Sequence, residues 1–387
     1  MSFKQYTLPR FIAMLLTVFC LSSCIDEFEA NLPDNDLQYL VVEGTICGQS
    51  DCEFYLGRSL SLNPTAEELI GRKITDARLT VCGSDGSHFP ANQKEAGMYL
   101  VTLGELNSNQ EYWIEIEWEG RTYQSTPTKP LKTPDISDLH FEQPRDDKQV
   151  DIFITPITNG PGELMYFQWD YQENWEIVTP YESLWDVDLE ANKIIEATAL
   201  LNRGWCKDLN HPSVIGNNVD FANNEIHNLR LISLDNMDNR FNRKYCITVR
   251  QRAISREQFE YEQLAQRQSD DMGGLFTPQP SELPSNIRCN DGQSKAIGYI
   301  GVTLNAVQQR LFITSKEVGY RLSRVPRILK DEEVSEMGPD AATLYGKGFR
   351  ILNYDPMAGT IQWIERWGID ATTWGATFVK PDFWDEE

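Results

Sequence analysis

Residues 112–125 read YWIEIEWEGRTYQS, and their pattern decides the fold class. Every second side chain from Tyr112 to Trp118 is apolar, which is the period of a half-buried strand. The next two residues, Glu-Gly, are a tight-turn signal, and residues 121–125 read as the returning strand. This stretch therefore predicts a β-hairpin.

Further strand signals surround this hairpin. Apolar and β-branched runs at residues 39–46, 54–60, 77–81 and 99–101 are separated by turn residues such as those at 83–87. About seven short strands in roughly 95 residues are typical of an immunoglobulin-like or fibronectin-like β-sandwich. We expect that sandwich over residues 37–133, and three prolines then mark a boundary: Pro127, Pro130 and Pro134.

Residues 136–387 predict a larger β-rich domain with a few short helices. The residues 166–171 and 175–178 read as two strands of a hairpin around the polar triplet 172–174. The clearest helix is residues 255–268, with Ser255 as its N-cap. The acidic residues 331–344 predict either a short helix or an exposed loop. Other expected strands are 150–154, 244–250, 296–302 and 310–314.

The composition excludes some partners. The 387 residues carry 58 acidic and 35 basic side chains, a formal net charge of −23. Nucleic acid needs a basic protein surface, so we expect no nucleic-acid partner. The same excess argues against binding anionic lipid head groups through the protein surface.

Residues 1–23 read as a lipoprotein signal peptide. Lys4 and Arg10 precede the apolar residues 11–20, a run too short to cross a bilayer as a helix. Residues 21–24 (LSSC) resemble a bacterial lipobox, in which cleavage before the cysteine leaves its thiol acylated. We therefore predict lipid attachment at Cys24, the alternative being a plain secreted protein.

Residues 24–36 form an acidic tether. Residues 25–29 (IDEFE) resemble the surface-export signal of Bacteroidota lipoproteins, although a merely solvated tether has the same composition. Export agrees with a disulfide framework, because six cysteines remain after the signal peptide and Cys24 are set aside. Sequence alone leaves their pairing open: Cys47, Cys52, Cys82, Cys206, Cys246 and Cys289.

No catalytic motif of the common hydrolase, nucleotide-binding or zinc-protease kinds occurs. The four histidines, His88, His140, His211 and His227, do not lie at ligand spacing from one another. We therefore predict no enzyme, no catalytic residue, no metal site and no cofactor, with an unlocatable carboxylate pair for glycoside hydrolysis as the open alternative.

Two acidic segments could face a cation or merely solvent. Asp186, Asp188 and Glu190 alternate, so on a strand they would share one face. Asp235 and Asp238 lie in a second oxygen-rich loop. The solvated reading is favoured for both segments, because neither matches a calcium-binding loop.

Tryptophan is abundant, with ten in the chain. Trp and Tyr suit binding surfaces, because an apolar ring carries one hydrogen-bonding edge. Trp175 and Trp185 flank an acidic segment and are predicted to be exposed ligand-binding residues for a sugar or peptide. The alternative is that they belong to the core.

Several segments together resemble the Bacteroidota lipoproteins known as domain of unknown function 4249. Each is short, and their order and spacing carry the resemblance: the lipobox, LVVEG at 40–44, SxxxFxY at 255–261, GGLF at 273–276, LPSNI at 283–287, IGYIG at 297–301 and KPDFW at 380–384. Many members carry Cys-x-Asp-Cys before the last motif, whereas residues 368–371 here are GIDA, so that link is absent.

The resemblance implies an outer-membrane lipoprotein, often encoded beside a TonB-dependent receptor that imports nutrients. It supplies no site residue other than Cys24. We therefore expect a surface-exposed, lipid-anchored accessory or ligand-capturing partner of a TonB-dependent transporter. The alternative is a structural or assembly-related interaction protein of the envelope with no small ligand.

Overall fold

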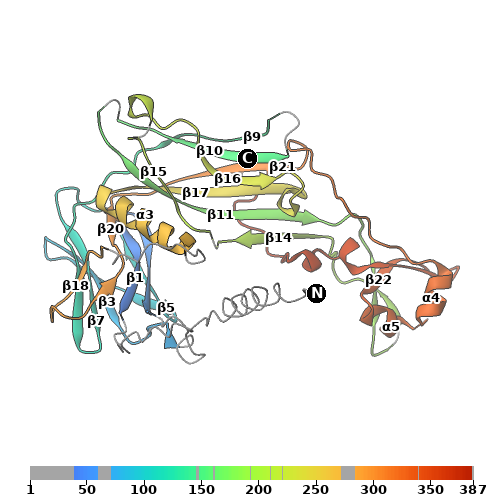
Figure 1. The fold of residues 1–387 in the computed structure, drawn as a ribbon. Helices are drawn as coiled ribbons and strands as arrows, with labels where there is room; N and C mark the ends of the chain where they lie inside the picture. Colours follow the sequence, from blue (N-terminus) through green and yellow to red (C-terminus); the bar gives the residue numbers. More distant parts are fainter. Residues whose placement is uncertain are drawn as a thin grey trace, which may run out of the picture. The chain divides into compact units, whose positions relative to one another are not determined.

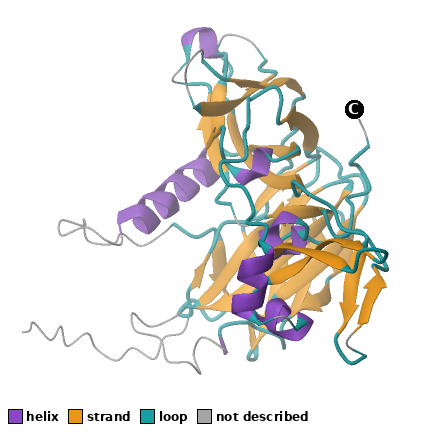
Figure 2. Ribbon diagram, turned by 90° about the vertical axis from the view of Figure 1, so that its right-hand side faces the viewer, coloured by secondary structure: helices purple, strands orange, loops and turns teal. Residues whose placement is uncertain are grey.

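The computed structural model describes residues 39–59, 71–144, 148–159, 162–191, 193–209, 211–219, 221–271, 284–338 and 340–385. The signal peptide, the acidic tether and Cys24 lie outside the described residues. The described chain is mainly β, as expected, with several antiparallel sheets and few helices (Figure 2).

Two sheets near the N-terminus share one buried core. The first has the order β19-β1-β2-β6-β5, with β20 also paired to β1, and the second has the order β18-β8-β7-β3-β4. Their strands are β1 (Leu40–Cys47), β2 (Ser50–Arg58), β3 (Arg78–Gly83), β4 (His88–Pro90), β5 (Asn92–Glu95), β6 (Met98–Leu103), β7 (Tyr112–Trp118), β8 (Arg121–Ser125), β18 (Ile287–Cys289), β19 (Ala296–Ile297) and β20 (Gly301–Thr303).

The predicted hairpin is β7 and β8. Trp118 pairs with Arg121, so the loop has two residues. Glu119 and Gly120 both have positive φ, 48° and 73°, which matches the right-handed twist of the strands that the turn joins. The alternating apolar side chains of β7 are buried.

Three strands of these two sheets come from beyond the expected boundary at residues 133–136. β18 pairs with β8, while β19 and β20 pair in parallel with β1. Residues 39–387 accordingly form one compact unit. The sandwich expected at residues 37–133 therefore lacks strands that complete its sheets. A pattern of short strands along the sequence does not reveal pairing partners that lie more than 150 residues away.

Two further sheets enclose a second core. One has the order β16-β10-β9, and the other has the order β14-β11-β17-β21, with β15 also paired to β11 (Figure 1). Their strands are β9 (Ile136–Glu142), β10 (Gln149–Pro156), β11 (Tyr166–Val178), β14 (Arg203–Asp208), β15 (Val214–Asn217), β16 (Leu229–Asp235), β17 (Lys244–Ile254) and β21 (Val307–Thr314).

The predicted hairpin around residues 172–174 is wrong. β11 runs without a break for 13 residues and pairs with β17 from Tyr166 to Glu176. The polar triplet resembles a turn, but Glu173 and Asn174 are buried. Their polar groups have partners inside the fold, so the strand continues through them.

The helix predicted at residues 255–268 is α3 (Arg256–Asp271). Ser255 acts as its N-cap, because its Oγ accepts a hydrogen bond of 3.1 Å from the backbone of Gln258. The acidic stretch 331–344, expected to be either a short helix or an exposed loop, contains helical segments.

A third core cluster lies among the remaining elements. These are β12 (Trp185–Asp188), β13 (Lys193–Glu196), α4 (Asp331–Met337), α5 (Ala341–Gly346), β22 (Phe349–Asp355) and β23 (Thr360–Glu365). Short 3-10 turns complete the described chain: η1 (Ala222–Asn224), η2 (Asn239–Phe241), η3 (Arg366–Gly368) and η4 (Ala371–Trp374). Among the described residues, no helix combines the length and apolar character needed to span a bilayer.

Candidate ligand-binding site

One face of the β11–β17 pair is polar. Gln168 lies directly opposite Arg252, and Asp170 lies directly opposite Arg250. Because side chains alternate along a strand, these four residues share a face, while neighbours such as Trp169 point into the second core. The polar face therefore follows from the register in which β11 and β17 pair.

Hydrogen bonds order this face. Gln168 donates from Nε2 to the Ser213 hydroxyl at 3.0 Å, and that hydroxyl donates to Asp170. Arg252 forms an ion pair with the other oxygen of Asp170. The chain of contacts holds each polar group in one orientation.

Two other elements close the space above this face. Arg250 donates from Nη2 to the hydroxyl of Ser50 at 2.6 Å, which links β17 to the β1–β2 hairpin. Helix α3 lies alongside β11 and β15 (Figure 1). Together they form a cleft of about 800 Å³. Its lining includes Glu43, Ser50, Asp51, Glu53, Gln168, Asp170, Ser213, Arg250, Arg252, Gln258, Tyr261, Glu262 and Tyr299.

The cleft is acidic. Five carboxylates and two guanidinium groups line it, a formal excess of three negative charges. Burial raises the pKa of Glu262, and the nearby carboxylates of Asp170 and Glu43 raise it further against the opposing effect of Arg252. Burial also raises the pKa of Tyr261 to about 12, so its hydroxyl stays protonated as a donor at neutral pH.

Two buried atoms in the cleft wall have no hydrogen-bond partner within the protein. They are Oε1 of Gln168 and Nε of Arg252, and the absence of a partner refers to the part of the chain that the structure describes. Gln168 is only 7% exposed, so this acceptor is not freely hydrated. Buried polar groups without partners are costly and rare, and the pair gives the cleft both an acceptor and a donor that are not used internally.

The two predicted binding tryptophans lie elsewhere. Trp175 is half-buried on β11 and packs against the second core cluster. Trp185 is half-buried on β12 and packs edge-on against Tyr354 at 5.2 Å in the third cluster. They belong to separate sheets, and neither lines the cleft.

The two acidic segments have internal partners. Asp186 accepts a hydrogen bond from the Tyr345 hydroxyl, and Asp188 accepts two backbone bonds in the turn that follows. Asp235 accepts from the backbone of Met237, while Asp238 caps η2 and pairs with Arg240. These contacts give the four aspartates roles in turns and in side-chain pairing.

The expected disulfides are absent among the described residues, where the six cysteines are buried and form no disulfide. Burial raises the pKa of three of them, Cys52, Cys82 and Cys206, to about 11. Cys52 instead donates to the backbone carbonyl of Cys47 at 3.1 Å. The expectation of export, together with the cysteine count, predicted disulfides, but these thiols pack as small apolar side chains.

A weak signal of the cleft is present in the sequence. Arg250 and Arg252 alternate with buried residues in β17, and Gln168 and Asp170 flank the buried Trp169 in β11. Alternating charges within core strands indicate that one face is not packed against apolar neighbours. The register that sets them opposite one another is not visible in the sequence.

The chain belongs to the family described as Domain of unknown function (DUF4249), whose match spans residues 25–309, which confirms the resemblance. No curated protein matched it. Among solved structures, the chain is similar to one titled "Structure of Yersinia pseudotuberculosis adhesin InvE", with 12% identity, 56% of this chain and 55% of that chain covered, and a TM-score of 0.17. The chain thus spans about half of that adhesin chain, and a TM-score of 0.17 is too low to indicate a shared fold.

Proposed function

We propose that this protein captures a small polar ligand in the cleft between the β1–β2 hairpin, the β11–β17 face and α3. In this proposal it is an outer-membrane lipoprotein, held through Cys24 and exposed at the cell surface, and it hands its ligand to a TonB-dependent transporter. The role is binding rather than catalysis. We further propose that the two N-terminal sheets form an immunoglobulin-like or fibronectin-like sandwich.

The cleft carries this proposal. Its volume of about 800 Å³ is within the range of small-molecule sites. Its unpartnered acceptor on Gln168 and donor on Arg252 are the kind of groups that fix a ligand's orientation.

The lining also limits the ligand class. A formal excess of three negative charges disfavours phosphates and other anions. Carboxylates, guanidinium groups and tyrosines together suit a hydroxyl-rich or positively charged ligand, such as a neutral oligosaccharide or a basic peptide.

A second role, as an envelope interaction protein without a small ligand, is favoured by a different observation. Of the large apolar side chains that are exposed in the described chain, all but Leu131 lie beyond residue 133. Leu184, Val325 and Val379 are 64%, 78% and 77% exposed. Exposed apolar side chains of this size suit contact with another protein.

A ligand screen by thermal shift separates the two roles, because a ligand that binds only the folded state raises Tm. We expect neutral oligosaccharides or basic peptides to raise Tm of the wild type, and Arg252→Gln to reduce that shift. Arg256→Gln is the matched control, since Arg256 is exposed, forms an ion pair with Glu260 on its own helix and does not line the cleft. If no compound shifts Tm, or if Arg252→Gln binds as the wild type does, the cleft is not the ligand site.

A further inference from the structure

A second arrangement of charged side chains lies further along β11. Glu173 is fully buried and directly faces Asp208 of β14 in the sheet register. Like charges directly opposite one another on neighbouring strands are destabilising. A positively charged group beside these two carboxylates would relieve their repulsion.

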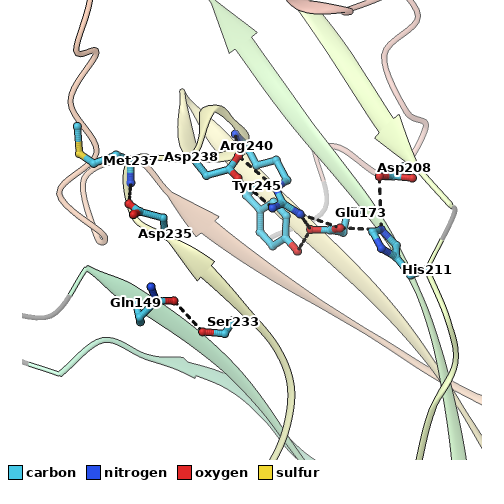
Figure 3. Close-up of polar contacts among 10 residues, drawn as sticks. All are labelled: Gln149, Glu173, Asp208, His211, Ser233, Asp235, Met237, Asp238, Arg240 and Tyr245. Carbon is cyan, nitrogen blue, oxygen red and sulfur yellow. Dashed lines mark hydrogen bonds and ion pairs between the residues drawn. The ribbon is translucent and has the colours of Figure 1, made fainter. Parts of the chain in front are cut away.

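Arg240 supplies part of that charge (Figure 3). Its Nη1 donates to both oxygens of Glu173, at 2.9 and 3.1 Å, and Tyr245 donates to Oε1 of Glu173 at 2.6 Å. Arg240 also pairs with Asp238 at 2.9 Å. Asp208 adds a third carboxylate to this group of charged side chains.

His211 lies close to both the Glu173 and the Asp208 carboxylates. Its Nε2 is 2.7 Å from Oε2 of Glu173 and 3.7 Å from Oδ2 of Asp208. This nitrogen is buried, yet among the described residues it has no hydrogen-bond partner of suitable geometry. The imidazole is held in place by stacking on Tyr171, with ring centroids 4.6 Å apart and an angle of 19°.

We infer that Glu173, Asp208 and His211 bind a divalent cation of the zinc type. One ligand atom from each residue lies within 4.8 Å of the others. Zinc takes imidazole nitrogen and carboxylate oxygen, and sites with three protein ligands take a water as the fourth. Asp208 is 41% exposed, so that side is open to water.

The surroundings have the features of a metal site. Metal-binding residues are commonly oriented by second contacts, here those of Arg240 and Tyr245 on Glu173 and of Tyr171 on His211. A divalent cation would also place positive charge between the carboxylates of Glu173 and Asp208. The competing explanation is that the His211 imidazole alone bridges these two carboxylates.

Titration of zinc chloride into the chelator-treated full chain, purified in detergent, distinguishes these explanations. We expect the wild type to bind one zinc ion at neutral pH by calorimetry and to gain Tm. Asp208→Asn and His211→Gln should each weaken binding at least about 10-fold, as losses around metal sites do.

The matched control is His227→Ala, because His227 is exposed and, among the described residues, is paired with a single carboxylate, that of Glu225 at 3.1 Å. It should bind zinc as the wild type does. Absence of zinc binding by the wild type, unchanged binding by His211→Gln, or loss of binding in His227→Ala would each overturn the assignment. His211→Gln keeps a polar side chain of similar length, so a folded variant with wild-type Tm in chelator makes the comparison valid.

Discussion

At the scale of single residues, Glu173 is the most informative position. Sequence patterns assign a Gln-Glu-Asn triplet to a turn, because charged residues rarely lie inside a core strand. In the structure Glu173 is completely buried, and its carboxylate accepts hydrogen bonds from Arg240 and Tyr245. Those partners are about 70 residues away in the sequence, so no local pattern could have revealed them.

Replacing Glu173 tests that burial. Glu173→Ala leaves Arg240 paired only with Asp238 and leaves the Tyr245 hydroxyl without its acceptor. Breaking a buried ion pair costs about 3–5 kcal/mol, and we expect about 3 kcal/mol because Arg240 is partly exposed. Urea unfolding in the presence of chelator measures this loss.

Glu260→Ala is the control, because it removes an exposed pair on α3 and should cost no more than about 0.5 kcal/mol. Equal losses in the two variants would show that Glu173 is not buried as described.

Glu262 gives a prediction about pH. Its pKa in the folded chain is raised, chiefly by burial, so folding favours the protonated carboxyl. The free energy of unfolding therefore falls as pH rises from the ordinary glutamate pKa, about 4.3, through the raised value. Glu262→Gln should increase Tm at neutral pH, and the gain should disappear below the ordinary pKa.

Thermal melts across this pH range provide the measurement, with Glu260→Gln as the exposed comparison on the same helix. A gain that is the same at low and neutral pH would contradict the assignment of Glu262 to the buried cleft wall.

At the scale of elements, local sequence patterns predicted strands and helices correctly where the interacting residues are close in sequence. The hairpin of β7 and β8 and the capped helix α3 both follow from contacts within a few residues. The error at β11 has a physical cause, since turn propensity is outweighed by pairing with β14 on one side and β17 on the other. The cleft was not predicted because it depends on the register of that pairing.

A proline substitution checks whether β11 continues through the triplet. Asn174 is paired on both sides, with Lys207 and with Cys246, so Asn174→Pro removes a ladder hydrogen bond whichever way its N–H points. We expect a loss of at least about 1–3 kcal/mol in urea unfolding from the unpaired buried carbonyl.

Ser108→Pro is the comparison, because residue 108 is the second position of the turn closed by the Gln110–Asn107 backbone hydrogen bond, where proline is favoured. It should be nearly neutral. A tolerated Asn174→Pro would favour a hairpin at residues 172–174 after all.

At the scale of the whole molecule, the N-terminal sheets and the rest of the chain are interdependent. Residues 39–133 alone would lack β18, β19 and β20, which leaves β1 and β8 with unpaired edges. Their buried side chains Ile287, Ala296 and Val302 would also be missing from the core. The return of the chain after α3 is a long-range feature that a boundary drawn at proline residues does not reveal.

We therefore expect a fragment of residues 39–133 to show no cooperative thermal transition by circular dichroism. Co-expression with a fragment of residues 284–309 should restore one, because it returns all three strands. Cooperative unfolding of the shorter fragment alone would contradict this dependence.

The central claim is that the protein captures a ligand at the cell surface for a TonB-dependent transporter. Affinity purification of the full chain from detergent-solubilised outer membranes, paired with protease treatment of whole cells, tests it most directly. The account predicts that a TonB-dependent barrel co-purifies and that the protease degrades the protein in intact cells. Purification of the protein alone, or its protection from protease in intact cells, would contradict the account.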